Sequence, residues 1–131
     1  MAEESVGRAR TVLVGDDDRD IRELVAKKLR NAGYEVSVAA DGLSALSAIK
    51  EQRPDLAVLD IMMPGLSGLD VVRQLRESGG HEAMAIILLT AKSQEFDVEN
   101  GFAVGADDYV VKPFSPREFL HRVNAVLARS R

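Results

Sequence analysis

The strict alternation of strand-like and helix-like segments is the feature that most constrains how this chain can fold. Two strand-like runs, LAVLD at 56–60 and AIILLT at 85–90, are apolar up to a polar last residue. Such runs are typical of parallel strands that helices cover on both faces. The run at 34–39 instead alternates apolar and polar residues, as on an edge strand. We predict five strands, at 11–15, 34–39, 56–60, 85–90 and 109–112.

The segments that follow these strands carry apolar residues at the spacing of an α-helix. Their apolar positions span 21–32, 43–49, 69–75, 96–104 and 119–127. Asp41 suits the N-cap of the second helix, and Pro116 suits the first turn of the fifth. Strands and helices that alternate with short connections predict an α/β fold, in which a doubly wound parallel sheet lies between two helical layers.

The length and composition indicate one domain and exclude several classes of protein. The 131 residues include no cysteine, so disulfides and thiolate sites are excluded, which suits the reducing cytoplasm. A net charge of −4 argues against nucleic-acid binding by this domain. The longest apolar run, 83–89, is far shorter than the roughly 20 residues that span a membrane. We expect a polar leader at 1–10 that is no secretory signal, a domain at 11–129, and the start of a linker or the end of the chain at 130–131.

Polar residues follow the predicted strands at their carboxyl ends, where doubly wound sheets place their functional sites. Asp16 and Asp17 follow the first strand, and Asp60, Thr90 and Lys112 end the third, fourth and fifth strands. The second strand ends in alanines and offers no such group. We therefore expect these five side chains to meet at one edge of the sheet.

Carboxylates at neighbouring strand ends repel one another, and a hard divalent cation relieves that repulsion. Mg²⁺ prefers oxygen ligands, so Asp16, Asp17 and Asp60 are candidate ligands for Mg²⁺, with Mn²⁺ as a possible substitute. The acidic triplet taken alone could equally be a solvated helix N-terminus. Asp18, its third member, is interpreted as the cap of the first helix.

Asp60 could have a second role, because a carboxylate can attack phosphorus and form an acyl phosphate. Phosphoryl transfer mainly requires positioning and neutralisation of the transferred oxygens. The ammonium group of Lys112 and the hydroxyl of Thr90 could supply that neutralisation. Considered singly, Lys112 could be a surface lysine and Thr90 an ordinary residue at a strand end.

Four segments of the sequence resemble the receiver domain of bacterial two-component response regulators, in that family's order and spacing. They are VLVGDDDRDIR, PDLAVLDIMMPGLSG, LLTA and GADDYVVKPFSPREFL, and the resemblance runs from Thr11 to Ala128. It implies a (βα)5 fold like that of flavodoxin and CheY, with the parallel strands in the order 2-1-3-4-5. It also implies a phosphoacceptor signalling domain rather than an enzyme, with at most self-phosphorylation from small donors and slow autodephosphorylation.

The resemblance assigns roles to the residues at the sheet edge. Asp60 would be the phosphoacceptor, and Asp16 and Asp17 would bind Mg²⁺ together with Asp60. The backbone carbonyl of Met62 would be a further metal ligand. Lys112 would be the family's lysine at the phosphoryl site.

The resemblance also implies a switch and shows one departure from the family pattern. Thr90 would move inward on phosphorylation, and Tyr109 would pack into the space that it leaves. Gly15 stands where the family usually has an apolar β-branched residue. A glycine permits unusual backbone angles or close approach, and here it would slightly loosen the placement of Asp16 and Asp17.

The segments KPFSPREF and GADDY look most like the subclass whose receivers precede a winged-helix DNA-binding domain, the OmpR/PhoB class. The resemblance implies regulation of transcription through such a domain outside this sequence, with a stand-alone receiver as the alternative. The upstream partner would be a sensor histidine kinase that contacts the first helix near Ile21 and Leu24. No membrane association is expected.

Charge patterning suggests a surface for self-association. Five acids and no basic residue lie between 93 and 111, whereas four arginines and one acid follow from 117 onward. Such stripes complement one another across a two-fold axis. By resemblance, a homodimer would form on phosphorylation through the fourth helix, fifth strand and fifth helix, although solvated faces with intramolecular pairs remain an alternative. The matching residues are Lys92, Asp107, Asp108, Arg117, Glu118 and Arg122.

Three other functions fit parts of the sequence. A phosphatase of the haloacid dehalogenase type needs an aspartate two residues after the nucleophile, and Met62 stands there. A flavodoxin-like binding domain needs a first loop that cradles phosphate, which the three aspartates at 16–18 would repel. A receiver that signals without phosphorylation would not require the full set of site residues found here.

Overall fold

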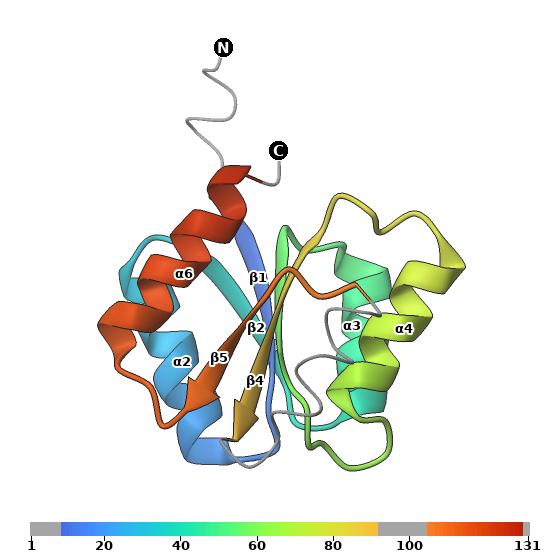
Figure 1. The fold of residues 1–131 in the computed structure, drawn as a ribbon, viewed down its shortest axis with the longest axis horizontal. Coiled ribbons are helices and arrows are strands. Elements are labelled where there is room, and N and C mark those ends of the chain that lie inside the picture. Colours follow the sequence, from blue (N-terminus) through green and yellow to red (C-terminus); the bar gives the residue numbers. More distant parts are fainter. Residues whose placement is uncertain (1–8, 92–104, 130–131) are drawn as a thin grey trace.

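The structure is a computed structural model that describes residues 9–91 and 105–129 (Figure 1). Strands and helices alternate through these residues, as the sequence predicts. In chain order they are β1 (Thr11–Gly15), α2 (Arg19–Asn31), β2 (Glu35–Ala39), α3 (Gly42–Gln52), β3 (Leu56–Asp60), α4 (Gly68–Ser78), β4 (Ala85–Ala91), β5 (Asp108–Lys112) and α6 (Pro116–Arg129). The helix predicted at 96–104 lies outside the described residues.

The five strands form one parallel sheet in the order β2-β1-β3-β4-β5, which confirms the predicted doubly wound topology. β1 and β3 begin and end where the sequence predicts. β2 and β5 each differ by one residue at their start, and β4 extends one residue further, to Ala91. Ala91 belongs to β4 because it pairs with Lys112 in the register of β5.

Two layers of helices cover the two faces of the sheet, α2 and α6 on one side and α3 and α4 on the other (Figure 1). Successive strand residues point to opposite faces. Leu13 and Leu59 therefore pack under α3 and α4, whereas Val14 and Val58 pack under α2 and α6. The two buried cores that result fix the strands that carry the polar residues of the sheet edge.

Local hydrogen bonds determine where the helices begin. The side chain of Asp18 accepts hydrogen bonds from the backbone N–H groups of Asp20 at 3.0 Å and Ile21 at 3.2 Å. Asp41 accepts one from Ser44 N at 2.8 Å. Both aspartates are thus N-caps, as predicted, and each satisfies backbone donors that have no partner within the helix.

The start of α4 lies directly against the end of β3, where Asp60 is located. Gly68 N donates to the carbonyl of Ile61 at 2.9 Å. A Cβ atom on Gly68 would lie 2.4 Å from the carbonyl oxygen of Asp60, so only glycine allows this approach. Among the described helices, none is long and apolar enough to cross a membrane.

Candidate phosphoryl and metal site

Two aspartates meet at the carboxyl ends of the neighbouring strands β1 and β3. Gly15 pairs with Leu59 in the register, so Asp16 and Asp60 are the next residues on the two strands. Asp16 has no exposed surface and Asp60 is 5% exposed, whereas Asp17 is exposed. One carboxylate oxygen from each of the three aspartates lies within 4.8 Å of the other two.

Lys112, from the end of β5, reaches both buried carboxylates. Its Nζ lies 3.0 Å from Asp16 Oδ2 and 3.3 Å from Asp60 Oδ2. Burial opposes the charge of Lys112, but the close contact of its ammonium group with the Asp16 carboxylate and the charges of Asp60 and Asp16 outweigh it and raise the pKa of this lysine. Lys112 is therefore a fixed cation between two anions.

Asp60 is held in an environment that favours its neutral form. Burial and the charge of Asp16 raise the pKa of Asp60 to about 6, against the opposing effects of Lys112 and a hydrogen bond from Met62 N. That backbone N–H lies 3.3 Å from Asp60 Oδ1. A carboxyl group with this pKa is still mostly ionised at neutral pH.

The oxygens of the three aspartates fit a metal ion. Asp16 Oδ1 accepts a hydrogen bond from Asp18 N at 2.9 Å. Asp16 Oδ2 is buried and accepts no well-directed hydrogen bond from the described residues, although Lys112 Nζ is close to it. A buried, incompletely satisfied carboxylate oxygen beside two further carboxylates is a donor set suited to a hard divalent cation. These residues could hold a metal.

Thr90 and Tyr109 lie close to this cluster in the sheet but are not part of it. Leu89 pairs with Asp60, so Thr90 lies one residue beyond that pair. Thr90 is fully buried, and its hydroxyl donates to the carbonyl of Ala91 at 3.1 Å. Tyr109 is half-buried and packs against the core under α3 and α4.

Gly15 provides room for side chains and has no unusual backbone conformation. A Cβ atom at this position would lie 3.0 Å from Leu59 Cδ2, 3.4 Å from Ala45 Cβ and 3.5 Å from Met63 Sδ. Its φ angle is not in the left-handed region. Of the two reasons that the sequence offers for a glycine, close packing is thus the one that applies.

Arg22 is a residue at this site that sequence reasoning missed. Its Nη1 donates to the backbone carbonyl of Asp16 at 2.9 Å. Arg22 lies near the N-terminus of α2, where the helix dipole disfavours a cation. That unfavourable position is the signal in the sequence that could have revealed a specific contact.

Several residues of the predicted dimer surface make contacts within the chain. Arg122 Nη1 lies 3.1 Å and 3.2 Å from the two carboxylate oxygens of Asp108, and Arg122 Nε lies 3.4 Å from Glu118 Oε2. Asp107 Oδ2 accepts a hydrogen bond from the backbone of Ile86 at 2.8 Å. Arg117 is exposed, and Lys92 lies outside the described residues.

The sequence and the fold were compared with those of known proteins. The response regulator receiver domain family matches residues 12–124. The chain is 46% identical over 119 residues to the DNA-binding response regulator MtrA of Mycolicibacterium paratuberculosis, an alignment that covers 91% of this chain and 52% of MtrA. It is 45% identical over 121 residues to the phosphate regulon transcriptional regulatory protein PhoB of Pseudomonas aeruginosa, covering 92% of this chain and 53% of PhoB.

A solved response regulator from Chloroflexus aurantiacus has the same fold. It superimposes with a TM-score of 0.88 at 38% identity and covers 93% of this chain and 100% of that structure. The chain spans about half the length of the curated relatives it matches. It belongs to the response regulator receiver domain family, as the receiver domain of a two-component response regulator whose relatives are of the OmpR/PhoB class.

Proposed function

We propose that this domain accepts a phosphoryl group from a sensor histidine kinase on Asp60, in a Mg²⁺-dependent reaction, and thereby stores a signal. One observation carries this proposal. Asp60 is a buried carboxylate at the carboxyl edge of the sheet, 3.3 Å from the ammonium group of Lys112 and beside the carboxylates of Asp16 and Asp17.

In the transfer, a carboxylate oxygen of Asp60 attacks the phosphorus of a phosphohistidine. The O–P bond forms while the P–N bond breaks, and the histidine ring leaves and takes a proton from the solvent. Asp60 must be ionised to attack, and a pKa of about 6 leaves most molecules ionised at neutral pH. Lys112 would then pair with an oxygen of the transferred group, which carries the charge that Asp60 held.

Asp16, Asp17 and Asp60, with the backbone carbonyl of Met62, would hold Mg²⁺, and Mn²⁺ would serve in its place. The bound ion would supply the positive charge that neutralises phosphoryl oxygens. Support comes from the donor set, which consists of oxygen atoms only and includes a buried carboxylate oxygen without a well-directed hydrogen bond among the described residues.

Thr90 and Tyr109 would convert phosphorylation into a change of surface. To reach a phosphoryl group on Asp60, the Thr90 hydroxyl would have to leave the carbonyl of Ala91, to which it now donates. Tyr109 lies half-buried on the adjacent strand β5 and would repack into the vacated space. Such a pair is a two-state element that a local charge can bias.

The output would be homodimerisation through the surface formed by the segment before β5, β5 and α6. Arg117 is exposed and has no ion pair among the described residues, so it is available to an acidic residue of a second copy. Because the curated relatives are about twice as long and one is named a DNA-binding response regulator, we infer that the dimer controls a DNA-binding domain. The paired charges of the proposed surface are Lys92 with Glu118, and Asp107 or Asp108 with Arg117 and Arg122.

Intact-mass measurement tests the acceptor. The protein is incubated with Mg²⁺ and a small acyl phosphate or phosphoramidate, with and without a chelator. We expect the mass of one phosphoryl group to appear only with free metal, and to be absent from Asp60→Asn. Labelling of Asp60→Asn at the same site and to the same extent would show that Asp60 is not the acceptor.

Turnover separates this function from that of a phosphatase. A receiver is labelled about once per chain, whereas a phosphatase releases phosphate from many donor molecules. The matched variant is Met62→Asp, which places a carboxyl group where haloacid dehalogenase phosphatases have their acid. We expect the wild type to retain about one phosphoryl group per chain and to release phosphate only slowly, and we expect this release to accelerate in Met62→Asp.

A further inference from the structure

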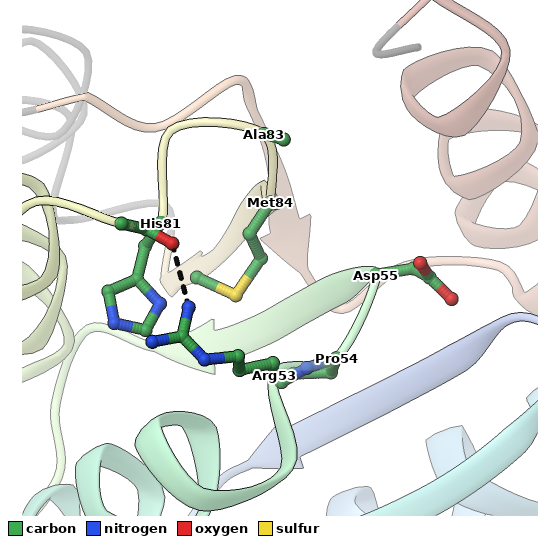
Figure 2. Close-up of a pocket in the computed structure, with 7 residues that line it drawn as sticks. Arg53, Pro54, Asp55, His81, Ala83 and Met84 are labelled. Atoms are coloured by element: carbon green, nitrogen blue, oxygen red, sulfur yellow. Dashed lines mark hydrogen bonds between the residues drawn. The ribbon is translucent and has the colours of Figure 1, made fainter.

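A polar pocket lies at the other end of β3 from Asp60, and Figure 2 shows the residues that line it. It has a volume of about 190 Å³ and is formed by residues that precede β3 and β4. Because both strands run toward the phosphoryl site, the pocket lies at their amino ends and shares no residue with that site. Its lining residues are Arg53, Pro54, Asp55, Gly80, His81, Ala83 and Met84.

His81 is a mostly buried side chain that lines this pocket. It is 7% exposed, and its ring makes no hydrogen bond with any of the described residues. Its backbone is firmly held, because its carbonyl accepts hydrogen bonds from Arg76 Nη1 at 2.6 Å and Met84 N at 3.2 Å. The ring nitrogens are not fully buried, so they are accessible to a small molecule that enters the pocket.

Arg53 presents its guanidinium group beside this ring (Figure 2). Its Nη1 donates to the carbonyl of Gly80 at 2.9 Å, and its other N–H groups have no acceptor among the described residues. Arg53 has a φ angle of 48° because it is the left-handed C-cap of α3, where its backbone N–H donates to the carbonyl of Ile49.

Arg53 and His81 can both donate hydrogen bonds into the pocket. Burial, and then the charges of Arg53, Lys50 and Arg76, lower the pKa of His81 against the opposing charge of Glu82, so the ring is neutral and offers one N–H group. The carboxylate of Asp55 points away from the ring in Figure 2.

Asp55 is also engaged elsewhere. Its Oδ2 accepts hydrogen bonds from Thr11 N at 2.8 Å and Thr11 Oγ1 at 3.3 Å. The pocket therefore combines the guanidinium group of Arg53 with the imidazole N–H group of His81. The basic side chains around His81 outnumber the acidic ones, and the carboxylate of Asp55 points away from the ring (Figure 2). Such a set of donors matches a ligand that brings negatively charged oxygen acceptors.

We propose that the pocket formed by Arg53 and His81 binds a small oxyanion, either inorganic phosphate or a short carboxylate. Arg53 would donate through the N–H groups that Gly80 does not use, and His81 through its ring. A volume of about 190 Å³ admits an anion of this size together with ordered water. This site is additional to the phosphoryl site, because Lys112 and the three aspartates lie at the other end of the strands.

Residue-resolved NMR titration of the metal-free protein tests this site. Phosphate and acetate are added in separate series, with chloride keeping the ionic strength constant. We expect saturable shifts of the backbone amides at 80–84 and of the His81 ring signals. Saturation by phosphate alone, by acetate alone or by both supports the proposal and identifies the anion. Shifts at 80–84 that do not saturate with either anion would overturn it.

Two variants and a control locate the effect. Arg53→Gly removes the guanidinium group and suits the left-handed backbone, so the fold is retained. His81→Phe keeps the ring size and removes the N–H group. Each should weaken binding about tenfold or more, as expected on loss of a charge-assisted or buried hydrogen bond. Arg73→Gln, which removes an exposed arginine paired with Asp70 outside the pocket, should bind as the wild type does. Unchanged affinity in Arg53→Gly would contradict the assignment.

Discussion

At the scale of single residues, the proposed phosphoryl site combines the buried carboxylates of Asp16 and Asp60 with the partly exposed ammonium group of Lys112. Asp16 and Asp60 share Lys112, so the chain carries one uncompensated negative charge there before Asp17 is counted. Burying unbalanced charge destabilises a fold unless a proton or a metal ion compensates it. The stability of the metal-free protein should therefore depend on pH and on Mg²⁺.

Acidification should stabilise the metal-free protein relative to Asp60→Asn. The pKa of Asp60 is about 6 in the folded state, against about 3.9 when unfolded, so the folded state binds the proton more tightly. The contribution of Asp60 to stability therefore falls as pH rises from about 4 to about 6 and stays low above that, by roughly 2–3 kcal/mol. Other carboxyl groups titrate in both proteins, so the measured quantity is the difference in unfolding free energy between them.

We expect Asp60→Asn to be the more stable protein at pH 7 and to lose most of this advantage at pH 4.5. Saturating Mg²⁺ should reduce the difference at pH 7, because the ion binds only the protein with the carboxylate intact. A difference that stays constant between pH 4.5 and 7 would show that Asp60 titrates normally.

Replacement of Lys112 by methionine should have opposite effects on stability and on metal affinity. Without metal, Lys112→Met leaves two buried carboxylates unpaired and should lower the unfolding free energy by about 3 kcal/mol. The same change removes a cation that competes for Asp16 Oδ2 and Asp60 Oδ2, so Mg²⁺ should bind more tightly. Chemical denaturation with and without Mg²⁺ measures both effects, and a variant that binds Mg²⁺ more weakly than the wild type would contradict this expectation.

The charge of Arg22 and its hydrogen bond to the Asp16 carbonyl should change Mg²⁺ affinity in opposite directions. If the arginine acted only through its charge, Arg22→Met would strengthen Mg²⁺ binding to the nearby carboxylates. We expect instead that its hydrogen bond to the backbone carbonyl of Asp16 positions Asp16 and Asp17, the proposed metal ligands. Arg22→Met should then weaken Mg²⁺ binding by about tenfold, as is common when a group that orients a ligand is lost. Calorimetric titration decides the sign, and Arg19→Met, which removes an exposed arginine of the same helix, is the control.

At the scale of helices and strands, features that depend on adjacent residues were predictable. The caps Asp18 and Asp41 follow from local sequence, because a cap bonds to N–H groups two or three residues away. The sequence matched Asp108 with Arg122 across a dimer, with pairing inside the chain as the alternative, and in the structure the two pair within the chain; the contact of Arg22 with Asp16 was not predicted. Each depends on how a helix is placed against a strand or loop, and sequence spacing does not determine that placement.

The ion pair between Asp108 and Arg122 connects β5 to α6. Substitution of Arg122 should therefore affect monomer stability, whereas substitution of Arg117, the other arginine of the proposed dimer surface, should not. Arg122→Glu should lower the stability of the monomer by about 1 kcal/mol, because it replaces a partly buried ion pair by two like charges. Arg117→Glu should leave the unfolding free energy within about 0.5 kcal/mol of the wild type, as is usual for exposed residues.

Both substitutions should weaken the dimer formed on phosphorylation or with beryllofluoride. Denaturation of the unphosphorylated protein measures the first effect, and analytical ultracentrifugation of the activated protein measures the second. If Arg117→Glu dimerises as the wild type does, Arg117 does not contribute to the dimer surface.

At the scale of the whole molecule, the sheet topology and the meeting of Asp16 and Asp60 were predictable, whereas the pocket at the amino ends of the strands was not. The apolar strands and the alternation with helices determine a doubly wound sheet, and that sheet determines that Asp16 and Asp60 meet. The pocket at the amino ends has no such signature. Arg53 and His81 are 28 positions apart, and only the packing of two loops brings them together.

The division of the interior into two cores has a consequence for redesign. The core under α3 and α4 includes no residue of α2, the expected kinase-binding helix, or of α6, whose outer side belongs to the proposed dimer surface, and Tyr109 of β5 packs against it. A combinatorial library confined to that core and retaining Tyr109 would therefore vary thermal stability while leaving the residues of α2 and α6 unchanged. Chimeras that exchange α3 and α4 with those of a relative should accordingly keep the partner preference of the parent that supplies α2 and α6.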